Sequence, residues 1–321
     1  MTNNIEFGYT ASVKVGTNPT AYTVVMDCGS SEFWLISDTC PQRGRRVPIG
    51  ISNSETFQSS DEKWTTTYED QSTLAGSIVT DDVAIGGRTL PGFSFGTADT
   101  LTGSLATATY DGVMGFGFSS TSRTGTPTIL DALAAGSSIP SGISGWKLSR
   151  NADGRNDGEI MFGEENPLKF LPDEQVFVQN LSGGSTKEWK FSIDRISMDG
   201  SQVLPARVGF VDTGTSALLA HPSDADAINN LIPGVVKVIG GTYAFPCGAQ
   251  RKLSVTINRR SFDVDPRDIV GAPIAAGYCH SNIVPDPLMN PGEWIIGIAF
   301  LKNVYLTLDV TRDRMGFAKL R

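Results

Sequence analysis

The sequence predicts a mostly β protein with a few short helices, and three features of the 321-residue chain lead to this class. Short runs of β-branched and aromatic residues recur along the chain, separated by turns in which Gly and Pro are frequent. Helical periodicity is confined to two short segments. An apolar run that ends in an aspartate motif occurs once in each half, which predicts two related domains.

The predicted strands extend through both halves of the chain. Residues 11–15 alternate apolar and polar side chains and end at Gly16, as expected for a strand with one buried face. Five further strands are predicted from their content of apolar, β-branched or aromatic residues: 22–26, 77–79, 159–162, 253–257 and 304–308.

Two short helices are expected. Residues 129–135 are predicted to form the first, and Gly136 is placed to end it. The second is predicted to begin after Ser223 as its N-cap, because Asp224 and Asp226 would then lie in the first turn, where the helix dipole favours acidic side chains.

No long linker divides the chain. The best boundary is the polar, Pro-containing stretch of residues 164–173. The sequence therefore predicts one domain at residues 1–165 and a second at residues 166–321, each of which contains one copy of the aspartate motif.

The charge balance excludes several classes of partner. The chain has 26 Lys and Arg against 34 Asp and Glu, a formal net charge of −8, so neither nucleic acid nor an anionic membrane surface is an expected partner. No run of 18 apolar residues occurs, so no membrane-spanning helix is expected. With only two histidines and no phosphate-binding glycine motif, the sequence predicts neither a metal nor a cofactor.

The internal repeat is the most informative feature. Residues 24–31 are an apolar strand that ends in Asp-x-Gly-Ser-Ser, and residues 208–216 are an apolar strand that ends in Asp-Thr-Gly-Thr-Ser. Each copy is followed, at a similar distance, by two apolar residues and a glycine, Gly115 in the first half and Gly297 in the second. A single Asp-x-Gly-Ser would indicate only a turn, but two copies with matched downstream partners predict a shared function.

Other hydrolase motifs are weaker. Residues 92–96 read Gly-x-Ser-x-Gly, but Pro91 precedes them and a polar turn follows, so the strand–turn–helix context of a serine hydrolase is missing. Paired carboxylates also serve glycosidases, yet that chemistry does not call for a duplicated Asp-x-Gly motif.

At these residues the chain resembles the pepsin-like aspartic endopeptidases, and the resemblance extends almost from end to end. It includes the segments at residues 64–68, 110–115 and 294–297. The resemblance implies a bilobal fold in which two β lobes, related by a pseudo-twofold axis, enclose a cleft. Each lobe would contribute one catalytic carboxylate, Asp27 and Asp212.

The chemistry explains why the motif occurs twice. Two carboxylates a few Å apart cannot both ionise readily, so they share one proton and can act as base and acid on an attacking water. Gly29 and Gly214 are expected to permit tight turns and to leave backbone N–H groups free for the carboxylates. The hydroxyls of Ser30 and Thr215 can donate to the outer carboxylate oxygens.

The resemblance also implies residues that bind an extended peptide with bulky apolar side chains around the cut. Tyr68 would close over the substrate as the flap tyrosine, with Trp34 as its hydrogen-bonding neighbour. Asp70 at the flap tip resembles fungal members that also accept Lys before the cut. The remaining residues implied at the substrate site line the main apolar pocket or lie beside the second aspartate: Val25, Tyr110, Val113, Thr213 and Ser216.

The cysteines depart from the family pattern. Four cysteines allow three pairings on paper. The resemblance implies a disulfide between Cys247 and Cys279, whereas Cys28 is expected between the lobes and Cys40 on a distant loop, unpaired. Cys28 stands where the family has Thr, and a thiol is the weaker hydrogen-bonding group. This residue keeps open an alternative function, a catalytically weakened scaffold that acts as a binding or inhibitor protein.

The resemblance implies several properties of the protein as a whole. It would be a secreted, extracellular monomer, made as a zymogen and present here as the mature form without signal peptide or pro-segment. Polypeptide substrates and statine-type transition-state inhibitors are the expected partners. Ile298 replaces an Asp that very acid-adapted members carry, which predicts a mildly acidic optimum.

Overall fold

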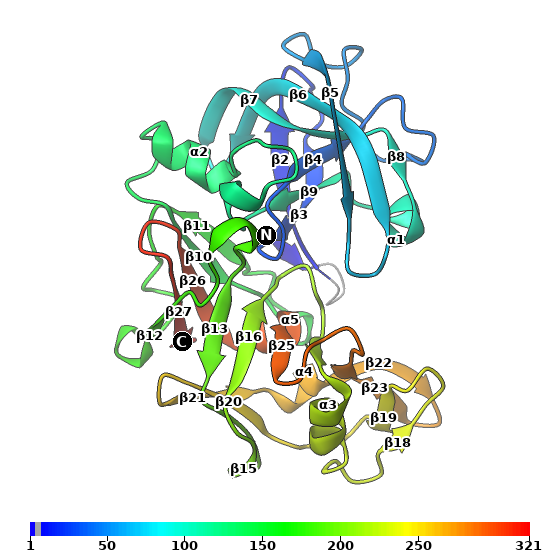
Figure 1. Ribbon diagram of the computed structural model, residues 1–321, viewed down its shortest axis with the longest axis vertical. Helices are drawn as coiled ribbons and strands as arrows, with labels where there is room; N and C mark the ends of the chain where they lie inside the picture. The colour runs from blue at the N-terminus through cyan, green and yellow to red at the C-terminus, as the bar shows by residue number, and fades with distance from the viewer. Residues whose placement is uncertain (4–7) are drawn as a thin grey trace.

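The computed structural model describes residues 1–3 and 8–321 as a β-rich molecule whose described strands fall into five sheets (Figure 1). This confirms the mostly β class. The largest sheet belongs to the first half and has the order β1-β2-β3-β9-β4-β7-β6-β5, with β8 paired to β6. Its strands are β1 Thr2–Asn3, β2 Tyr9–Val15, β3 Tyr22–Asp27, β4 Phe33–Ile36, β5 Gln58–Thr67, β6 Thr73–Ile85, β7 Arg88–Ala98, β8 Thr100–Leu101 and β9 Gly112–Gly115.

Three sheets belong to the second half, with the orders β13-β16-β25-β17-β24, β15-β14-β20-β21 and β18-β19-β23-β22. The first contains β13 Lys190–Ile193, β16 Arg207–Val211, β17 Leu218–Ala220, β24 Ile283–Pro285 and β25 Glu293–Ile296. The second contains β14 Arg195–Met198, β15 Ser201–Leu204, β20 Leu253–Ile257 and β21 Arg260–Val264. The third contains β18 Val236–Lys237, β19 Tyr243–Pro246, β22 Val270–Ala275 and β23 Tyr278–Ser281.

The fifth sheet joins the two halves. Its order is β11-β10-β26-β27-β12, and the strands are β10 Ile143–Lys147, β11 Glu159–Phe162, β12 Val176–Gln179, β26 Val304–Asp309 and β27 Arg314–Lys319. The boundary predicted between residues 165 and 166 therefore falls inside a shared sheet, between β11 and β12. Phe116 of the first half packs edge-on against Trp146 of β10, with 4.9 Å between the ring centroids, so the core is continuous with this sheet.

The helices are few and short, as predicted. They are α1 Gly103–Thr107, α2 Ile129–Ala135, α3 Pro222–Asn229, α4 Pro266–Ile269 and α5 Ile298–Leu301. Among the described residues, none of the helices has the length and apolar character needed to cross a membrane. The helix predicted at residues 129–135 is present with Gly136 as its C-cap.

The predicted start of α3 is wrong by two residues. The N-cap is His221 rather than Ser223, and the imidazole Nδ1 of His221 accepts a hydrogen bond from the Ser223 N–H. Pro222 occupies the first helical position, where its fixed φ and missing N–H are tolerated. A histidine is an uncommon N-cap, which is why the more usual Ser was selected from the sequence.

Strand pairing repeats in the two halves and confirms that the sequence repeat is structural. In the first half, β3 runs parallel to β9, β9 is antiparallel to β4, and β4 is parallel to β7. In the second half, β16, β25, β17 and β24 repeat the same succession. The register pairs Asp27 with Gly115 and Val211 with Ile296, so both aspartate motifs begin at the same place in the pattern.

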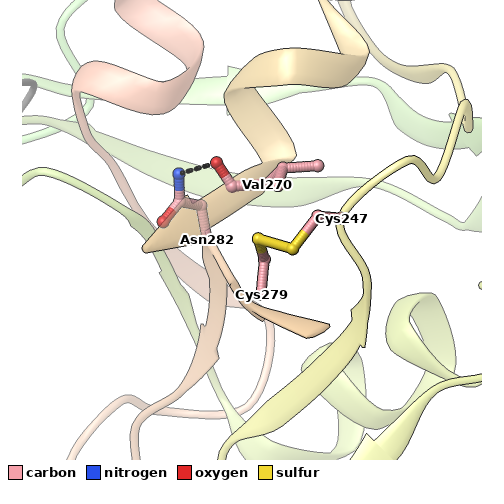
Figure 2. The surroundings of a disulfide bond; sticks show 4 residues. All are labelled: Cys247, Val270, Cys279 and Asn282. Atoms are coloured by element: carbon pink, nitrogen blue, oxygen red, sulfur yellow. Dashed lines mark hydrogen bonds between the residues drawn. A yellow bond between two sulfur atoms is a disulfide. The ribbon is translucent and has the colours of Figure 1, made fainter. Parts of the chain in front are cut away.

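One disulfide is formed, between Cys247 and Cys279, as the resemblance implied (Figure 2). It ties the turn after β19 to β23 in the small sheet at the far end of the second half. Close to it, the Asn282 side-chain amide donates to the Val270 carbonyl and links the neighbouring edge of that sheet. Cys28 and Cys40 are both free thiols, as expected from their separation, and both are buried.

Candidate active site

The two repeated aspartates meet where the two halves face each other. Asp27 is the last residue of β3, and Asp212 follows β16 directly. A Cβ placed on Gly29 would lie 2.4 Å from Oδ1 of Asp212, and one placed on Gly214 would lie 2.7 Å from Oδ1 of Asp27. Each aspartate therefore touches the glycine of the opposite motif. Two strand ends far apart in sequence place their carboxyl groups side by side.

This contact gives a further reason for the two glycines, beside the tight turns that were predicted. Neither Gly29 nor Gly214 is among the residues with positive φ, so a left-handed turn is not what requires glycine here. The requirement is steric, because any side chain would occupy the space of the facing carboxylate. Their predicted second role is observed, since both N–H groups donate to the carboxylate of their own motif.

The hydrogen bonds to the two carboxylates match one another. The N–H of Gly29 donates to Asp27 Oδ1 at 2.8 Å, and the N–H of Gly214 donates to Asp212 Oδ1 at 2.7 Å. The outer oxygens receive the predicted hydroxyls: Ser30 Oγ donates to Asp27 Oδ2, and Thr215 Oγ1 donates to Asp212 Oδ2, each at 2.5 Å. Both carboxylates are therefore fixed in rotation by one backbone and one side-chain donor.

The electrostatics of the pair follow from burial and proximity. Asp27 is buried and only 6% exposed. Burial, and after it the charge of Asp212, raise the pKa of Asp27 well above its ordinary value, although hydrogen bonds from Ser30 and Gly29 act in the opposite direction. The pair therefore retains one proton at acidic pH, a behaviour already established for the carboxyl pairs of aspartic proteases.

A second set of hydrogen bonds ties the two aspartate loops together behind the carboxylates. The Cys28 N–H donates to Thr213 Oγ1, which in turn donates to the Met26 carbonyl, both at 2.9 Å. In the reverse direction the Thr213 N–H donates to Cys28 Sγ at 3.2 Å, and the thiol donates to the Val211 carbonyl at 3.6 Å. We call this set the Cys28–Thr213 bridge. The thiol makes the bonds expected of the usual hydroxyl, at longer distances.

The bridge corrects the prediction for Thr213. This residue is 0% exposed, so its side chain is inaccessible to a substrate and serves instead to join the two halves. Its position beside the second aspartate suggested a role in substrate binding, but its hydroxyl bonds to Cys28 and Met26 of the other half. Ser216, predicted with it, is half-buried, and its carbonyl accepts from the Ala299 N–H.

The flap turn, residues 68–72 between β5 and β6, carries the predicted tyrosine. The Trp34 indole N–H donates to the Tyr68 hydroxyl at 2.8 Å, which is the hydrogen bond that the resemblance implied. Burial raises the pKa of Tyr68 well above its ordinary value, and the charge of Asp27 adds to the shift. The Tyr68 hydroxyl therefore stays protonated and lies within the electrostatic reach of Asp27.

The predicted apolar pocket residues come together in one cluster next to Asp27. Val25, Tyr110 and Val113 pack in the same hydrophobic cluster as Trp34 and Tyr68. Helix α1, which was not predicted, also contributes: Leu105 is buried in the cluster and Ala106 packs against it. A five-residue helix has too little periodicity to be recognised from sequence.

The acidic side chains of the flap turn behave differently from one another. Asp70 is exposed, and its carboxylate accepts from the Ser72 N–H at 2.9 Å and from the hydroxyls of Ser72 and Ser104. Those bonds lower its pKa even though partial burial acts against them. For Glu69, partial desolvation and then the charges of Asp286, Asp212 and Glu188 raise the pKa to about 7. The sequence had not singled out Glu69.

One hollow of the molecule does not belong to the site. A hollow of about 300 Å³ is lined in part by Arg150, Asp265 and Lys302, but by no residue of the aspartate motifs. Arg150 and Lys302 both pair with the buried carboxylate of Asp268, so this region is a structural ion network. Across residues 1–3 and 8–321, no three His, Cys, Asp or Glu side chains are grouped so that they could hold a metal ion.

Comparison with known proteins identifies the class to which this geometry belongs. A family model described as eukaryotic aspartyl protease matches residues 8–320, and the chain therefore belongs to this family.

Individual relatives also match almost the whole chain. A probable aspartic-type endopeptidase CTSD of Arthroderma benhamiae is 33% identical over 317 residues, which cover 98% of this chain and 61% of the relative. Rhizopuspepsin of Rhizopus chinensis is 29% identical over 322 residues, with 96% of this chain and 76% of the relative covered. Cathepsin E of Mus musculus is 26% identical over 329 residues, with 98% and 81% covered. The chain spans about three fifths of the length of the first relative.

The Cys28–Thr213 bridge predicts that the thiol is suboptimal. In Cys28→Thr the hydroxyl should form stronger bonds to the Thr213 N–H and the Val211 carbonyl, and we expect the free energy of unfolding to rise by about 1 kcal/mol. In Cys28→Ala both bonds are lost, so a fall of about 1–3 kcal/mol is expected. Denaturant unfolding of the three proteins measures the order Thr above Cys above Ala. A Cys28→Ala protein as stable as wild type would contradict this interpretation.

The raised pKa of Asp27 predicts a pH-dependent effect of Asp27→Asn on stability. The neutral carboxyl is favoured in the folded state, so its contribution is complete below the unfolded pKa and is lost as the pH rises through the raised folded pKa. The amide has no charge to bury at any pH. Asp27→Asn should therefore change stability little near pH 4 and raise it by roughly 2 kcal/mol near pH 8. Thermal unfolding across this pH range tests it, and a stability difference that does not vary with pH would contradict it.

Proposed function

We propose that the chain is an endopeptidase that hydrolyses peptide bonds at acidic pH with a water activated between Asp27 and Asp212. One observation carries the proposal: the carboxylates of buried Asp27 and half-buried Asp212 each lie against the glycine of the opposite motif, and each is held by its own glycine N–H and hydroxyl. Family membership supports the same reaction class. The roles of the individual residues are part of the proposal.

The shared proton allows both halves of the reaction. The ionised carboxylate takes a proton from water as the water oxygen attacks the peptide carbon, while the protonated carboxyl gives its proton to the carbonyl oxygen. A neutral tetrahedral diol results. In the second step the carboxylate that lacks a proton takes one from a diol hydroxyl, and the other carboxyl protonates the departing nitrogen as the C–N bond breaks. Two carboxylates that share one proton end the cycle as they began.

Substrate would be bound by the flap turn and by the apolar cluster beside Asp27. Tyr68 and Trp34 form a hydrogen-bonded pair at the edge of this cluster, and Val25, Tyr110 and Val113 contribute apolar surface. These contacts support a preference for a bulky apolar side chain next to the cut bond. The ionised Asp70 on the flap turn supports a second preference, for Lys at the same position.

The alternative is an inactive scaffold that binds proteins without cutting them. Cys28 favoured this possibility, because loss of the bridge would leave the carboxylates unsupported. The bridge is nevertheless complete, with the thiol in the place of a hydroxyl, and neither carboxylate lacks its donors. The geometry therefore supports the enzyme over the binding protein.

We also propose that the protein is secreted as a monomer and that statine-type compounds bind it. The Cys247–Cys279 disulfide supports an oxidising compartment. Protein isolated from its natural source and denatured should contain two free thiols, from Cys28 and Cys40, and one disulfide. Four free thiols would contradict secretion.

Loss of either carboxylate should abolish cleavage. In Asp27→Asn or Asp212→Asn only one carboxyl group of the pair remains, and it cannot act as base and acid at the same time. A fall in kcat of at least about 1,000-fold is therefore expected. The measurement is cleavage of an unfolded protein between about pH 3 and pH 6, with and without a statine-type inhibitor. Asp226→Asn, on the distant helix α3, is the matched control and should leave cleavage unchanged. Equal cleavage by all four proteins, or none by wild type, would contradict the proposed function.

The acceptance of Lys before the cut should depend on Asp70. Asp70→Asn keeps the size of the side chain and removes its charge, so kcat/KM for a peptide with Lys at that position should fall about tenfold. The same peptide with Phe should be cut as well as by wild type. Assays of wild type and variant under the same conditions give the ratio of kcat/KM for the Lys peptide to kcat/KM for the Phe peptide. An unchanged ratio would show that Asp70 does not set the preference for Lys.

A further inference from the structure

A buried tryptophan of the second half is linked to the first aspartate loop by hydrogen bonds through Phe116. Trp189 lies just before β13 and is 2% exposed. Its indole N–H donates to the carbonyl of Phe116 at 3.0 Å, and both groups are buried. Phe116 follows Gly115 at the end of β9, so this bond crosses from the second half of the chain to the first.

The segment that receives this bond supports the Asp27 loop. Three successive N–H groups of residues 115–117 donate to the loop, and the middle one, from Phe116, donates to the Asp27 carbonyl at 2.7 Å. The two flanking groups donate to Glu32 and Ser30 at 2.9 Å and 2.8 Å. Phe116 thus accepts from the Trp189 indole with its carbonyl and donates with its N–H to Asp27, the residue that carries the first carboxylate.

Trp189 also supports the second aspartate. Its backbone carbonyl accepts from the Val211 N–H at 2.9 Å, and Val211 directly precedes Asp212. The side chain and the main chain of a single residue therefore reach the supports of both carboxylates. This connection shares no hydrogen bond with the Cys28–Thr213 bridge.

Ring packing fixes the indole in place. The Trp189 ring lies 4.2 Å from the Phe118 ring, between centroids, and the Phe118 N–H donates to Ser31 Oγ at 3.0 Å. The Lys187 ammonium lies over the same Phe118 ring, 4.4 Å from its centroid. The indole therefore has little freedom to turn away from Phe116, and its N–H defines one distance between the two halves.

We propose that Trp189 is a positioning residue for the proposed reaction: its indole N–H, through Phe116, and its carbonyl, through Val211, set the separation of Asp27 and Asp212. Without the N–H, the Phe116 carbonyl would be a buried acceptor with no partner, and residues 115–117 would shift to reach one. The Asp27 loop would move with them. A small change in the separation of two carboxylates alters the sharing of the proton and slows the chemical step more than substrate binding.

The test compares two tryptophans that each lose one buried indole hydrogen bond. Trp189→Phe keeps the contact with Phe118 and removes the N–H. Trp294→Phe is the matched control, because Trp294 is 1% exposed and its N–H donates to Asp224 at 2.9 Å, away from both aspartate loops. For Trp189→Phe we expect kcat to fall about tenfold with KM within about twofold of wild type. For Trp294→Phe we expect a lower thermal midpoint but an unchanged kcat.

The outcomes separate this inference from the proposed function on which it rests. If wild type cuts no peptide, the proposed function fails. If wild type is active and the two variants lose stability and kcat to the same extent, Trp189 has only a packing role and the inference is wrong. A rise in KM with kcat unchanged in Trp189→Phe would also overturn it, since the loss would then concern binding.

A measurement on the wild-type protein covers the case in which Trp189→Phe does not fold. With ¹⁵N-labelled tryptophan, hydrogen exchange of each indole N–H is followed with and without a statine-type inhibitor. A ligand that fixes both carboxylates should slow exchange at Trp189 at least about tenfold more than at Trp294. Equal slowing at the two indoles would overturn the inference.

Discussion

The structure depends on the contact between two carboxyl groups of like charge. Water screens the charges of such groups and weakens the repulsion between them, so burial makes the repulsion stronger. Here Asp27 and Asp212 are each packed against the glycine of the other motif, so neither can withdraw. The system lowers its energy by retaining a proton, and this single proton is what makes one group an acid and the other a base. The arrangement is costly for stability at neutral pH, and it provides the acid and the base that the proposed reaction needs at acidic pH.

Duplication is the means by which the fold maintains this contact. The same succession of parallel and antiparallel strands occurs in both halves, and it delivers one aspartate from each to the same place. The halves are then joined by a shared sheet, by the Cys28–Thr213 bridge and by Trp189. Each connection lies behind the carboxylates, which leaves their outer oxygens to the hydroxyls of Ser30 and Thr215.

Most of the site could be predicted from the sequence because its residues lie in short motifs, each of which can be recognised within a few neighbouring residues. The motifs at Asp27 and Asp212 and the pairing of Trp34 with Tyr68 follow from short patterns and a family resemblance. What the sequence could not show are contacts between distant segments. Thr213 was expected near the substrate and is instead buried between the halves, and no local pattern marks Trp189 as more than a core residue.

The most direct test of the central claim is the titration of the two carboxyl groups by ¹³C NMR of protein labelled at the aspartate side-chain carboxyl carbon. The signals of the pair are assigned by their absence from Asp27→Asn and Asp212→Asn. We predict that the Asp27 signal of wild type titrates well above the ordinary pKa of 3.8, and that this pKa falls in Asp212→Asn. Two signals that titrate independently near the ordinary value would show that the carboxyl groups do not share a proton, and would contradict the account.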